Sequence, residues 1–350
     1  MLEGDARAAT GSSGRGPLLL AGDVGGTKVD LAVVSLERGP RQPLAKRQYP
    51  SAAYVSLAEM VRAFLGEAGM EVDAACLDVA GPVIGGEARL TNLPWDISEA
   101  SLAAALGVQR VWLMNDLVAT ASAIPLLRSD ELHPVREGQP VPGGTIAVIA
   151  PGTGLGEAFL TVESDRYRAH ASEGGHAAFA PTNDLELELL RELWKRFDHV
   201  SFERVASGVG IPNLYDFLRD RQGRTESSRL AVELGKTADR TRPILQAALD
   251  PAEPDPLAHA TLVLFLQILG TEAANLALKM LATGGVYLAG GIAQVLRDAL
   301  RTAPFIHAFT RAGRFSTMLE RVPVNVVLGE VALLGAASEG LRLLAGPPAA

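Results

Sequence analysis

Short apolar runs separated by glycine-rich turns dominate the first part of the chain. Residues 18–22 and 29–34 have the length and composition of β-strands, and the turn at 23–28 between them contains a glycine pair. This pattern predicts a β-hairpin. A second hairpin of the same kind is predicted from strands at 146–149 and 158–162 around the turn at 151–156.

The two glycine turns form a weak internal repeat. Gly25 and Gly152 take equivalent places in it, at the spacing of a domain rather than of a solenoid unit. Helical spacing at 57–65 and 98–106 alternates with strand-like runs at 76–80 and 111–114, which predicts an α/β sheet. We therefore expect two related α/β halves.

Beyond Thr182 the spacing of apolar residues becomes mostly helical. Apolar residues at steps of three or four predict a long helix at 262–280, followed by a strand at 286–289. The polar, proline-containing stretch at 130–142 is expected to carry the crossing between domains. A last amphipathic helix at 330–344 could pack back on the first domain.

Composition indicates a globular protein of about two domains and disfavours a nucleic-acid-binding protein. With 350 residues, 48% hydrophobic and 21% charged, the chain has the size of two domains. A net charge of −8 disfavours nucleic acid as a partner. The single cysteine, Cys76, lies in an apolar run and is expected to be a buried, inert thiol.

Targeting signals are not apparent in the sequence. The stretch 1–16 is small and polar and is expected to be a disordered tail rather than a secretory signal. No run approaches the roughly 20 apolar residues needed to cross a bilayer. We therefore expect a cytoplasmic protein that does not bind membranes.

The first glycine turn is the leading candidate for a phosphate site. It is not a P-loop, because strand-like residues rather than a helix follow Lys28. Gly25 and Gly26 would let backbone N–H groups approach phosphate oxygens, Thr27 adds a hydroxyl, and Asp23 could hold hydrated Mg²⁺. A tight hairpin turn without a ligand is the alternative.

The second glycine turn strengthens this interpretation. Gly152, Thr153 and Gly154 belong to a turn that is too rich in glycine for a simple hairpin. A pair of such hairpins could bind a triphosphate from opposite sides. Gly290 and Gly291 follow a strand and could admit a nucleotide base or simply end that strand.

Polar residues at two other places could act on a hydroxyl substrate. Asn115 and Asp116 follow a predicted strand, where ligands of open α/β sheets bind, although an aspartate there could also cap a helix. A carboxylate at this place could accept the proton of an attacking hydroxyl. Glu173 and His176 flank two glycines and suit vicinal hydroxyls.

Two nearby features have simpler interpretations. His170, Glu173 and His176 have a spacing that suggests zinc ligands, but the central glycines would spoil the helix that aligns such ligands. We therefore expect no zinc site. Glu203, taken alone, could be a solvated helix charge.

Taken together, these motifs resemble the zinc-free bacterial glucokinase family of the actin-like sugar kinase superfamily. The resemblance runs from about Leu18 to Gly340. It implies that Asp116 is the general base and that Asn92, Asn115, Asp116, Glu173, His176 and Glu203 bind the sugar. It also implies nucleotide contacts from Asp23, Gly25, Gly26, Thr27, Lys28, Gly152, Thr153, Gly154, Gly290 and Gly291.

The resemblance further implies a fold and a reaction. The fold would be a two-domain, ribonuclease H-like α/β architecture with a cleft between the domains, divided into 17–126 plus 329–350 and 127–328. The reaction would be ATP-dependent and Mg²⁺-dependent phosphorylation of glucose to glucose 6-phosphate, the entry step of glycolysis, by a homodimer. A broader hexose or amino-sugar kinase and a sugar-independent actin-like ATPase are the alternatives.

The chain departs from the family pattern at three positions. Ala178 replaces a residue that is commonly polar, Pro151 precedes the second glycine turn, and Glu157 follows that turn where an apolar residue is more usual. Glu157 could weaken triphosphate affinity if it points inward. The related family of repressors and sugar kinases carries a cysteine-rich zinc site after its Glu-Gly-Gly-His stretch, and this chain has no cysteine there.

Overall fold

A computed structural model describes residues 16–89 and 95–346. Backbone contacts divide the chain into one unit of residues 1–116 and 332–350 and a second unit of residues 117–331. The first boundary therefore falls just after Asp116, the first residue of helix α3 (Asp116–Ala123), whereas the sequence placed it at 126. The expected tail at 1–16 and the sugar-binding role of Asn92 concern residues outside the described ranges, apart from Gly16.

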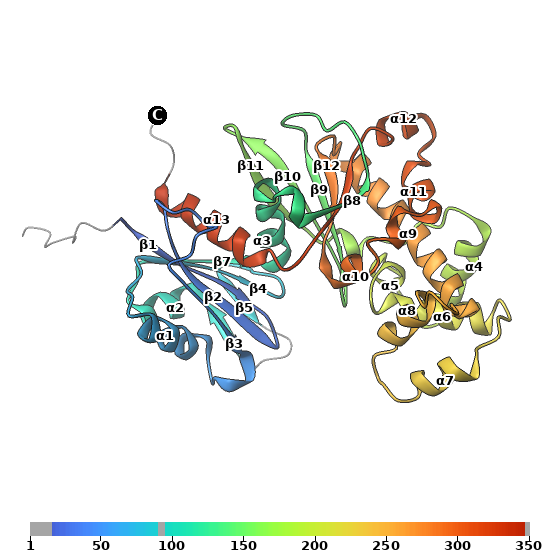
Figure 1. Ribbon diagram of the computed structural model, residues 1–350, viewed down its shortest axis with the longest axis horizontal. Helices are drawn as coiled ribbons and strands as arrows, with labels where there is room; N and C mark the ends of the chain where they lie inside the picture. The colour runs from blue at the N-terminus through green and yellow to red at the C-terminus, as the bar shows by residue number, and fades with distance from the viewer. Residues whose placement is uncertain (1–15, 90–94, 347–350) are drawn as a thin grey trace, which may run out of the picture. The chain divides into compact units, whose positions relative to one another are not determined.

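The first unit is built on a five-stranded mixed sheet (Figure 1). Its first three strands are antiparallel neighbours, and two further strands add parallel to the first. The predicted glycine hairpin is confirmed, with the turn between β1 and β2. The strand order is β3 (Ala45–Pro50), β2 (Lys28–Ser35), β1 (Leu18–Val24), β4 (Ala74–Val79) and β7 (Arg110–Asn115).

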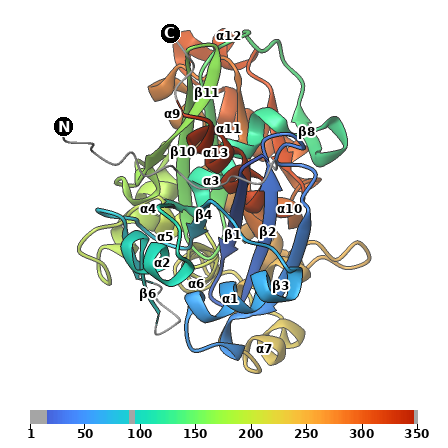
Figure 2. The same cartoon turned by 90° about the vertical axis from the view of Figure 1, so that its left-hand side faces the viewer.

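Alternating side chains of this sheet point to its two opposite faces, and both faces are covered by helices. Leu18 and Leu20 pack in the core that includes residues of α1 (Leu57–Ala68) and α2 (Glu99–Leu106). Leu19 and Cys76 point to the opposite face, where α13 (Ala332–Ala345) covers them. The unit is thus a three-layer α/β/α sandwich, and its β1–β2–β3 side faces the viewer in Figure 2.

Local sequence explains the ends of these helices. Ser56 caps α1 by accepting a hydrogen bond from the Glu59 N–H at 3.2 Å, and Gly69 ends the helix with φ +62°. Ser98 caps α2 in the same way. The predictions of helices at 57–65, 98–106 and 330–344 are confirmed, as is the packing of the last helix on the first unit.

The second unit repeats the sheet pattern and adds one strand. Three antiparallel strands are again followed by two that extend the sheet in parallel, which confirms the internal repeat. A sixth strand pairs at residues 132–136, so the stretch expected to link the domains is instead part of this sheet. The order is β11 (Arg166–Ser172), β10 (Leu155–Glu163), β9 (Ile146–Pro151), β12 (Gly285–Leu288), β13 (Val324–Val327) and β8 (Leu132–Arg136).

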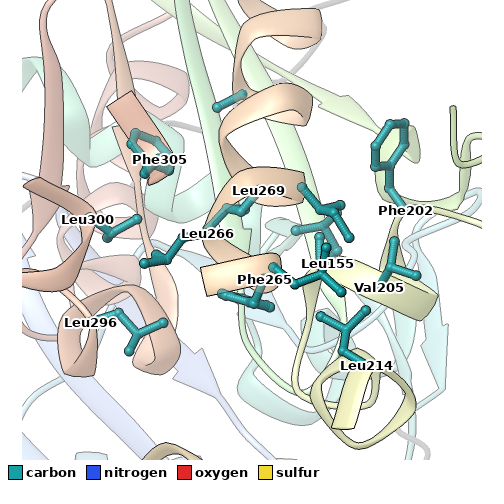
Figure 3. Close-up of a cluster of buried hydrophobic side chains, with 14 of the residues drawn as sticks. Leu155, Phe202, Val205, Leu214, Phe265, Leu266, Leu269, Leu296, Leu300 and Phe305 are labelled. Carbon is teal, nitrogen blue, oxygen red and sulfur yellow. The ribbon is translucent and has the colours of Figure 1, made fainter. Parts of the chain in front are cut away.

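Helix α9 (Pro256–Met280) forms the centre of the second unit. Asp255 caps its start, and Leu266, Leu269 and Phe265 are buried with side chains from several other elements (Figure 3). Among the described residues, this is the one helix that is long and apolar enough to span a membrane. The sequence-based expectation that no run approaches that length is therefore corrected. Because 72% of its apolar window is buried inside the protein, a core helix accounts for its composition.

The remaining elements complete the two units. In the first unit they are β5 (Glu87–Arg89), β6 (Asp96–Ser98) and η1 (Ser51–Ala53). The α-helices outside those already given are α3 (Asp116–Ala123), α4 (Asp184–Leu193), α5 (Glu203–Ala206), α6 (Gly210–Asp220), α7 (Ser228–Leu234), α8 (Thr241–Ala248), α10 (Gly290–Val295), α11 (Ala303–Thr310) and α12 (Ser316–Leu319). The other 3₁₀ turns are η2 (Ile124–Leu126), η3 (Ser129–Glu131), η4 (Gly174–His176), η5 (Ala299–Arg301) and η6 (Gly313–Phe315).

Candidate functional site

The glycine turn of the first unit is held from one side by Ser51. The Gly25 N–H donates to the Lys28 carbonyl at 3.0 Å, which closes the turn. The buried Ser51 hydroxyl donates to the Gly25 carbonyl at 2.8 Å, and its N–H donates to the Thr27 carbonyl at 2.9 Å. The backbone of the tip is therefore fixed while the Thr27 side chain remains exposed.

Acidic groups lie at the carboxyl ends of the parallel strands beside this turn. Asp23 stands opposite Asp78 in the register of β1 and β4, and Val79 stands opposite Asn115 in that of β4 and β7. The Asn115 amide donates to the Gly81 carbonyl at 3.0 Å. Asp116 follows Asn115 directly, is partly exposed and begins α3.

Asp78 is completely buried in this group. Burial raises its pKa well above the usual value, and the negative charges of Asp23 and Asp116 raise it further. Neither oxygen of an ionised Asp78 has a donor among the described residues, whereas a protonated Asp78 can donate to the Asp23 carboxylate. Sequence reasoning missed this residue, although an acid inside an otherwise apolar strand was a visible signal.

The glycine turn of the second unit is held by the segment that follows α5. The Gly152 N–H donates to the Gly154 carbonyl at 2.9 Å across the turn. Gly208 and Val209 then donate their N–H groups to the carbonyls of Gly152 and Thr153, at 2.8 and 3.1 Å. As in the first unit, the carbonyls of the tip are engaged and the threonine side chain is exposed.

Glu203 belongs to the same assembly. Its carboxylate accepts a hydrogen bond from the Leu155 N–H at 3.1 Å and occupies the space that a Cβ on Gly154 would need. The residue is only partly buried, at the start of α5. The structure therefore gives Glu203 a definite contact beside the second turn, in place of the solvated helix charge that the sequence left open.

Gly290 also approaches this turn. Its φ is +84°, which favours glycine, and a Cβ there would lie 2.9 Å from the Pro151 carbonyl oxygen. The Ala289 N–H donates to the Ile149 carbonyl at 2.9 Å and extends the β9–β12 pairing to the start of α10. Gly291 is exposed, with open space where a side chain would be.

The turn at Glu173–His176 rests directly on β10. The Gly174 N–H donates to the Ser172 hydroxyl at 3.0 Å, and a Cβ on Gly175 would overlap the Leu155 carbonyl. The side chains of Glu173 and His176 are exposed, with 3.9 Å between the Glu173 Oε2 and the His176 Nε2. A rigid backbone thus presents a carboxylate and an imidazole to solvent.

The three residues with the spacing of zinc ligands have other contacts or are exposed to solvent. The described part of the chain contains no group of three or more histidine, cysteine, aspartate or glutamate side chains able to hold a metal ion. His170 instead stacks on Phe159 with ring centroids 4.9 Å apart, and its Nε2 lies 2.8 Å from the Thr161 hydroxyl.

The structure therefore assembles the predicted residues within each unit. The first unit places Asp23, Asn115 and Asp116 at one sheet edge beside the turn of Gly25, Gly26, Thr27 and Lys28. The second unit places the turn of Gly152, Thr153 and Gly154 next to Glu203 and Gly290, with the Glu173–His176 turn on the following strand. Such sites can bind phosphate through backbone and hydroxyl donors, and bind polyols through carboxylate and imidazole groups.

Known proteins resemble the chain over nearly its whole length. The Glucokinase family model matches residues 20–341. A glucokinase of Nostoc punctiforme is 40% identical, over 93% of this chain and 99% of its own length, and one of Synechocystis is 39% identical over 91% and 96%.

Solved structures agree with this family match. A glucokinase from an Antarctic psychrotroph has a TM-score of 0.79 at 31% identity, covering 94% of this chain and all of its own. A ROK family glucokinase from Streptomyces griseus, solved with glucose and AMPPNP, has a TM-score of 0.59 at 19% identity over 93% and 99%, a likeness of fold alone.

Proposed function

The chain belongs to the glucokinase family, whose members phosphorylate glucose at the expense of ATP, and we propose which of its residues carry that reaction. The fold is the two-domain actin-like sugar kinase fold. The product is glucose 6-phosphate, which enters glycolysis. The observation that supports the residue assignments is that each glycine turn is held by hydrogen bonds within its own unit and has polar residues beside it.

Asp116 is the proposed general base. A carboxylate at the carboxyl end of a parallel strand can accept the proton of the sugar hydroxymethyl group as its oxygen attacks the γ-phosphoryl group. Asn115 precedes it, and its amide is oriented by the Gly81 carbonyl. A protonated Asp78 donates a hydrogen bond to Asp23 and adds no third charge, which limits repulsion around Asp116.

Glucose recognition is assigned to the polar groups that the resemblance implies. Glu173 and His176 can bind vicinal hydroxyls from the exposed turn, and Glu203 can do so while it also accepts from Leu155. Asn115 contributes from the first unit. Asn92, outside the described ranges, is proposed for the same role on the resemblance alone.

ATP phosphates are assigned to the two glycine turns. The Gly25 and Gly152 N–H groups close their own turns, so the phosphate oxygens are assigned to the exposed hydroxyls of Thr27 and Thr153 and to other backbone N–H groups of the turns. Lys28 adds positive charge, and Gly290 and Gly291 leave space for the rest of the nucleotide.

Magnesium fits this arrangement through water. Mg²⁺ keeps several waters and takes one or two carboxylates plus substrate phosphates, and Asp23 is the carboxylate at the edge of the first glycine turn. When bound, the ion would neutralise charge on the transferring phosphoryl group.

A substrate panel tests this function. The chain would be assayed with glucose, mannose, fructose, N-acetylglucosamine and no sugar, each with ATP or polyphosphate, and ADP and sugar phosphate would be measured separately. Glucose with ATP should give the highest kcat/KM and equal amounts of the two products. A preference for another hexose would make the chain a broader hexose kinase, and equal ADP release without sugar would make it an ATPase.

Assembly and location complete the proposal. A cytoplasmic homodimer that binds neither membranes nor nucleic acid is proposed on the likeness to the family. Light scattering of the full chain at micromolar concentration should give twice the mass of the 36.8 kDa chain. A monomer mass at that concentration would overturn the dimer and leave the catalytic assignments standing.

A further inference from the structure

Two glutamates meet in the interior of the second unit. Glu157 of β10 is 2% exposed and Glu272 of α9 is fully buried. The two carboxyl groups are near enough that the charge of Glu272 and a hydrogen bond to it raise the pKa of Glu157, and the Oε1 atoms of both have no hydrogen-bond partner among the residues the structure describes. Because two carboxylates can only accept hydrogen bonds, the contact requires one shared proton.

The Glu157–Glu272 pair has one positively charged neighbour, on the Glu272 side. The Lys279 ammonium lies 3.7 Å from the Glu272 Oε1, and the Asn275 amide donates to the Glu272 Oε2 at 2.9 Å. One proton on the pair leaves a single negative charge opposite a single positive charge. A second negative charge would have no counter-ion in this interior, where unpaired charge is costly.

The elements packed around Glu157 contribute little other charge. Ser172, its partner on β11, is neutral, and Glu203 of α5 is engaged by the Leu155 N–H two residues along β10. The charged groups of the Glu173–His176 turn are exposed to solvent. Burial and the Glu272 carboxylate raise the pKa of Glu157 to about 8, while Lys279 acts in the opposite direction.

Glu157 also touches the turn that we assign to sugar binding. A Cβ on Gly174 would overlap its Oε2, so the turn backbone lies directly over the carboxyl group. The Ser172 hydroxyl, which faces the same space, accepts the Gly174 N–H. Any outward movement of the Glu157 carboxylate must therefore displace Gly174 and its neighbours.

We propose that Glu157 and Glu272 share one buried proton, and that this protonated pair is a positioning element that holds Glu173 and His176 in place for glucose. Loss of the proton drives the two carboxylates apart and moves the turn. Affinity for glucose then falls at alkaline pH, while the glycine turns that serve ATP are unaffected. This proposal rests on the assignment of the Glu173–His176 turn to sugar binding.

Steady-state kinetics between pH 6.5 and 9.5 test the proposal. In the unmodified chain KM for glucose should rise at least about threefold from pH 7 to 9, because a single proton can change affinity by up to tenfold per pH unit. KM for ATP should change less. Glu157→Gln should keep the neutral KM within about threefold and lose the rise, since its amide donates to Glu272 at every pH.

Two further variants separate positioning from general damage. Lys279→Met leaves Glu157 in place and should move the rise in KM to higher pH, because the counter-ion that favours the ionised pair is gone. Glu163→Gln, an exposed change on the same strand, should keep the unmodified profile. If Glu157→Gln does not fold, Glu272→Gln supplies the same measurement.

The outcomes distinguish this inference from the function on which it rests. A glucose KM that is flat with pH in the unmodified chain, or a Glu157→Gln profile identical to it, overturns the shared-proton proposal. Glu173→Gln should raise KM for glucose at every pH. If Glu173→Gln leaves that KM unchanged, the sugar assignment of the turn is wrong, whatever Glu157 does.

Discussion

The Glu203 carboxylate accepts a hydrogen bond from the Leu155 N–H at 3.1 Å. This contact connects a residue proposed to bind the sugar with the glycine turn proposed to bind phosphate. One side chain thus serves two assignments within the second unit. Removing the carboxylate and neutralising it should have different consequences.

Glu203→Ala should weaken both substrates. It leaves the Leu155 N–H without its acceptor and removes a group from sugar binding, and a lost charged hydrogen bond costs about 1–3 kcal/mol, or roughly tenfold in affinity. Glu203→Gln keeps an oxygen for Leu155 and should raise KM for glucose while KM for ATP stays within about twofold. Equal effects of the two variants on the ATP KM would contradict the contact's role in holding the turn.

Gly174 should not tolerate a side chain. Because its Cβ would overlap the Glu157 carboxylate, Gly174→Ala must shift the turn, and KM for glucose should rise about tenfold with an unchanged circular dichroism spectrum. Gly235→Ala is the matched control, since its Cβ would meet only ordinary contacts at 3.5 Å or more. Normal glucose kinetics for Gly174→Ala would show that the turn does not bind the sugar.

Glu157 should make stability depend on pH in a known direction. Its pKa rises from 4.5 to about 8 on folding, so between these values the folded chain keeps a proton that the unfolded chain releases. This group's favourable contribution is fully present below the lower value and is lost by the upper one, at up to about 1.4 kcal/mol per pH unit.

Glu157→Gln has no such proton to lose. Its free energy of unfolding relative to the unmodified chain should therefore increase from pH 5.5 to 7.5 in urea denaturation, whereas that of Glu163→Gln should stay constant. A constant difference for Glu157→Gln would mean that its carboxyl group titrates normally.

Cys76 should be unreactive in the folded protein. It is 1% exposed, its Sγ lies 3.9 Å from the Met114 sulfur, and burial raises its pKa above the usual value of a thiol. Ellman's reagent should label no thiol in the native chain and one per chain in guanidinium chloride. Rapid labelling without denaturant would show that α13 does not stay packed over this face.

Local patterns predicted the elements of the fold well. The alternation of Leu18, Leu19 and Leu20 fits a strand buried on both faces, and the glycine turns at Gly25 and Gly152 are at the hairpin tips. The strand at 132–136 was missed because it contains His133 and Pro134 and pairs at a sheet edge with a register shift. Its pairing depends on contacts far away in the sequence, which local propensity does not report.

The candidate site was predictable where the chemistry lies in short motifs. Asp116, Glu173 and His176 could be read from strand ends and glycine neighbours, whereas the partners of buried acids could not. The sequence places Glu157 and Glu272 more than a hundred positions apart, and only tertiary packing brings them together. The structure places the Glu157 carboxyl group against Gly174, and its effect on triphosphate affinity stays a prediction.

The identity of the base is the central claim, and a single-turnover comparison of the unmodified chain with Asp116→Asn tests it most directly. The variant should phosphorylate glucose about 10²–10⁴ times more slowly while binding ATP with near-normal affinity, since only proton transfer is removed. Glu37→Gln, an exposed change in the same unit, should react at the unmodified rate. A phosphorylation rate for Asp116→Asn within about threefold of the unmodified chain would contradict the account.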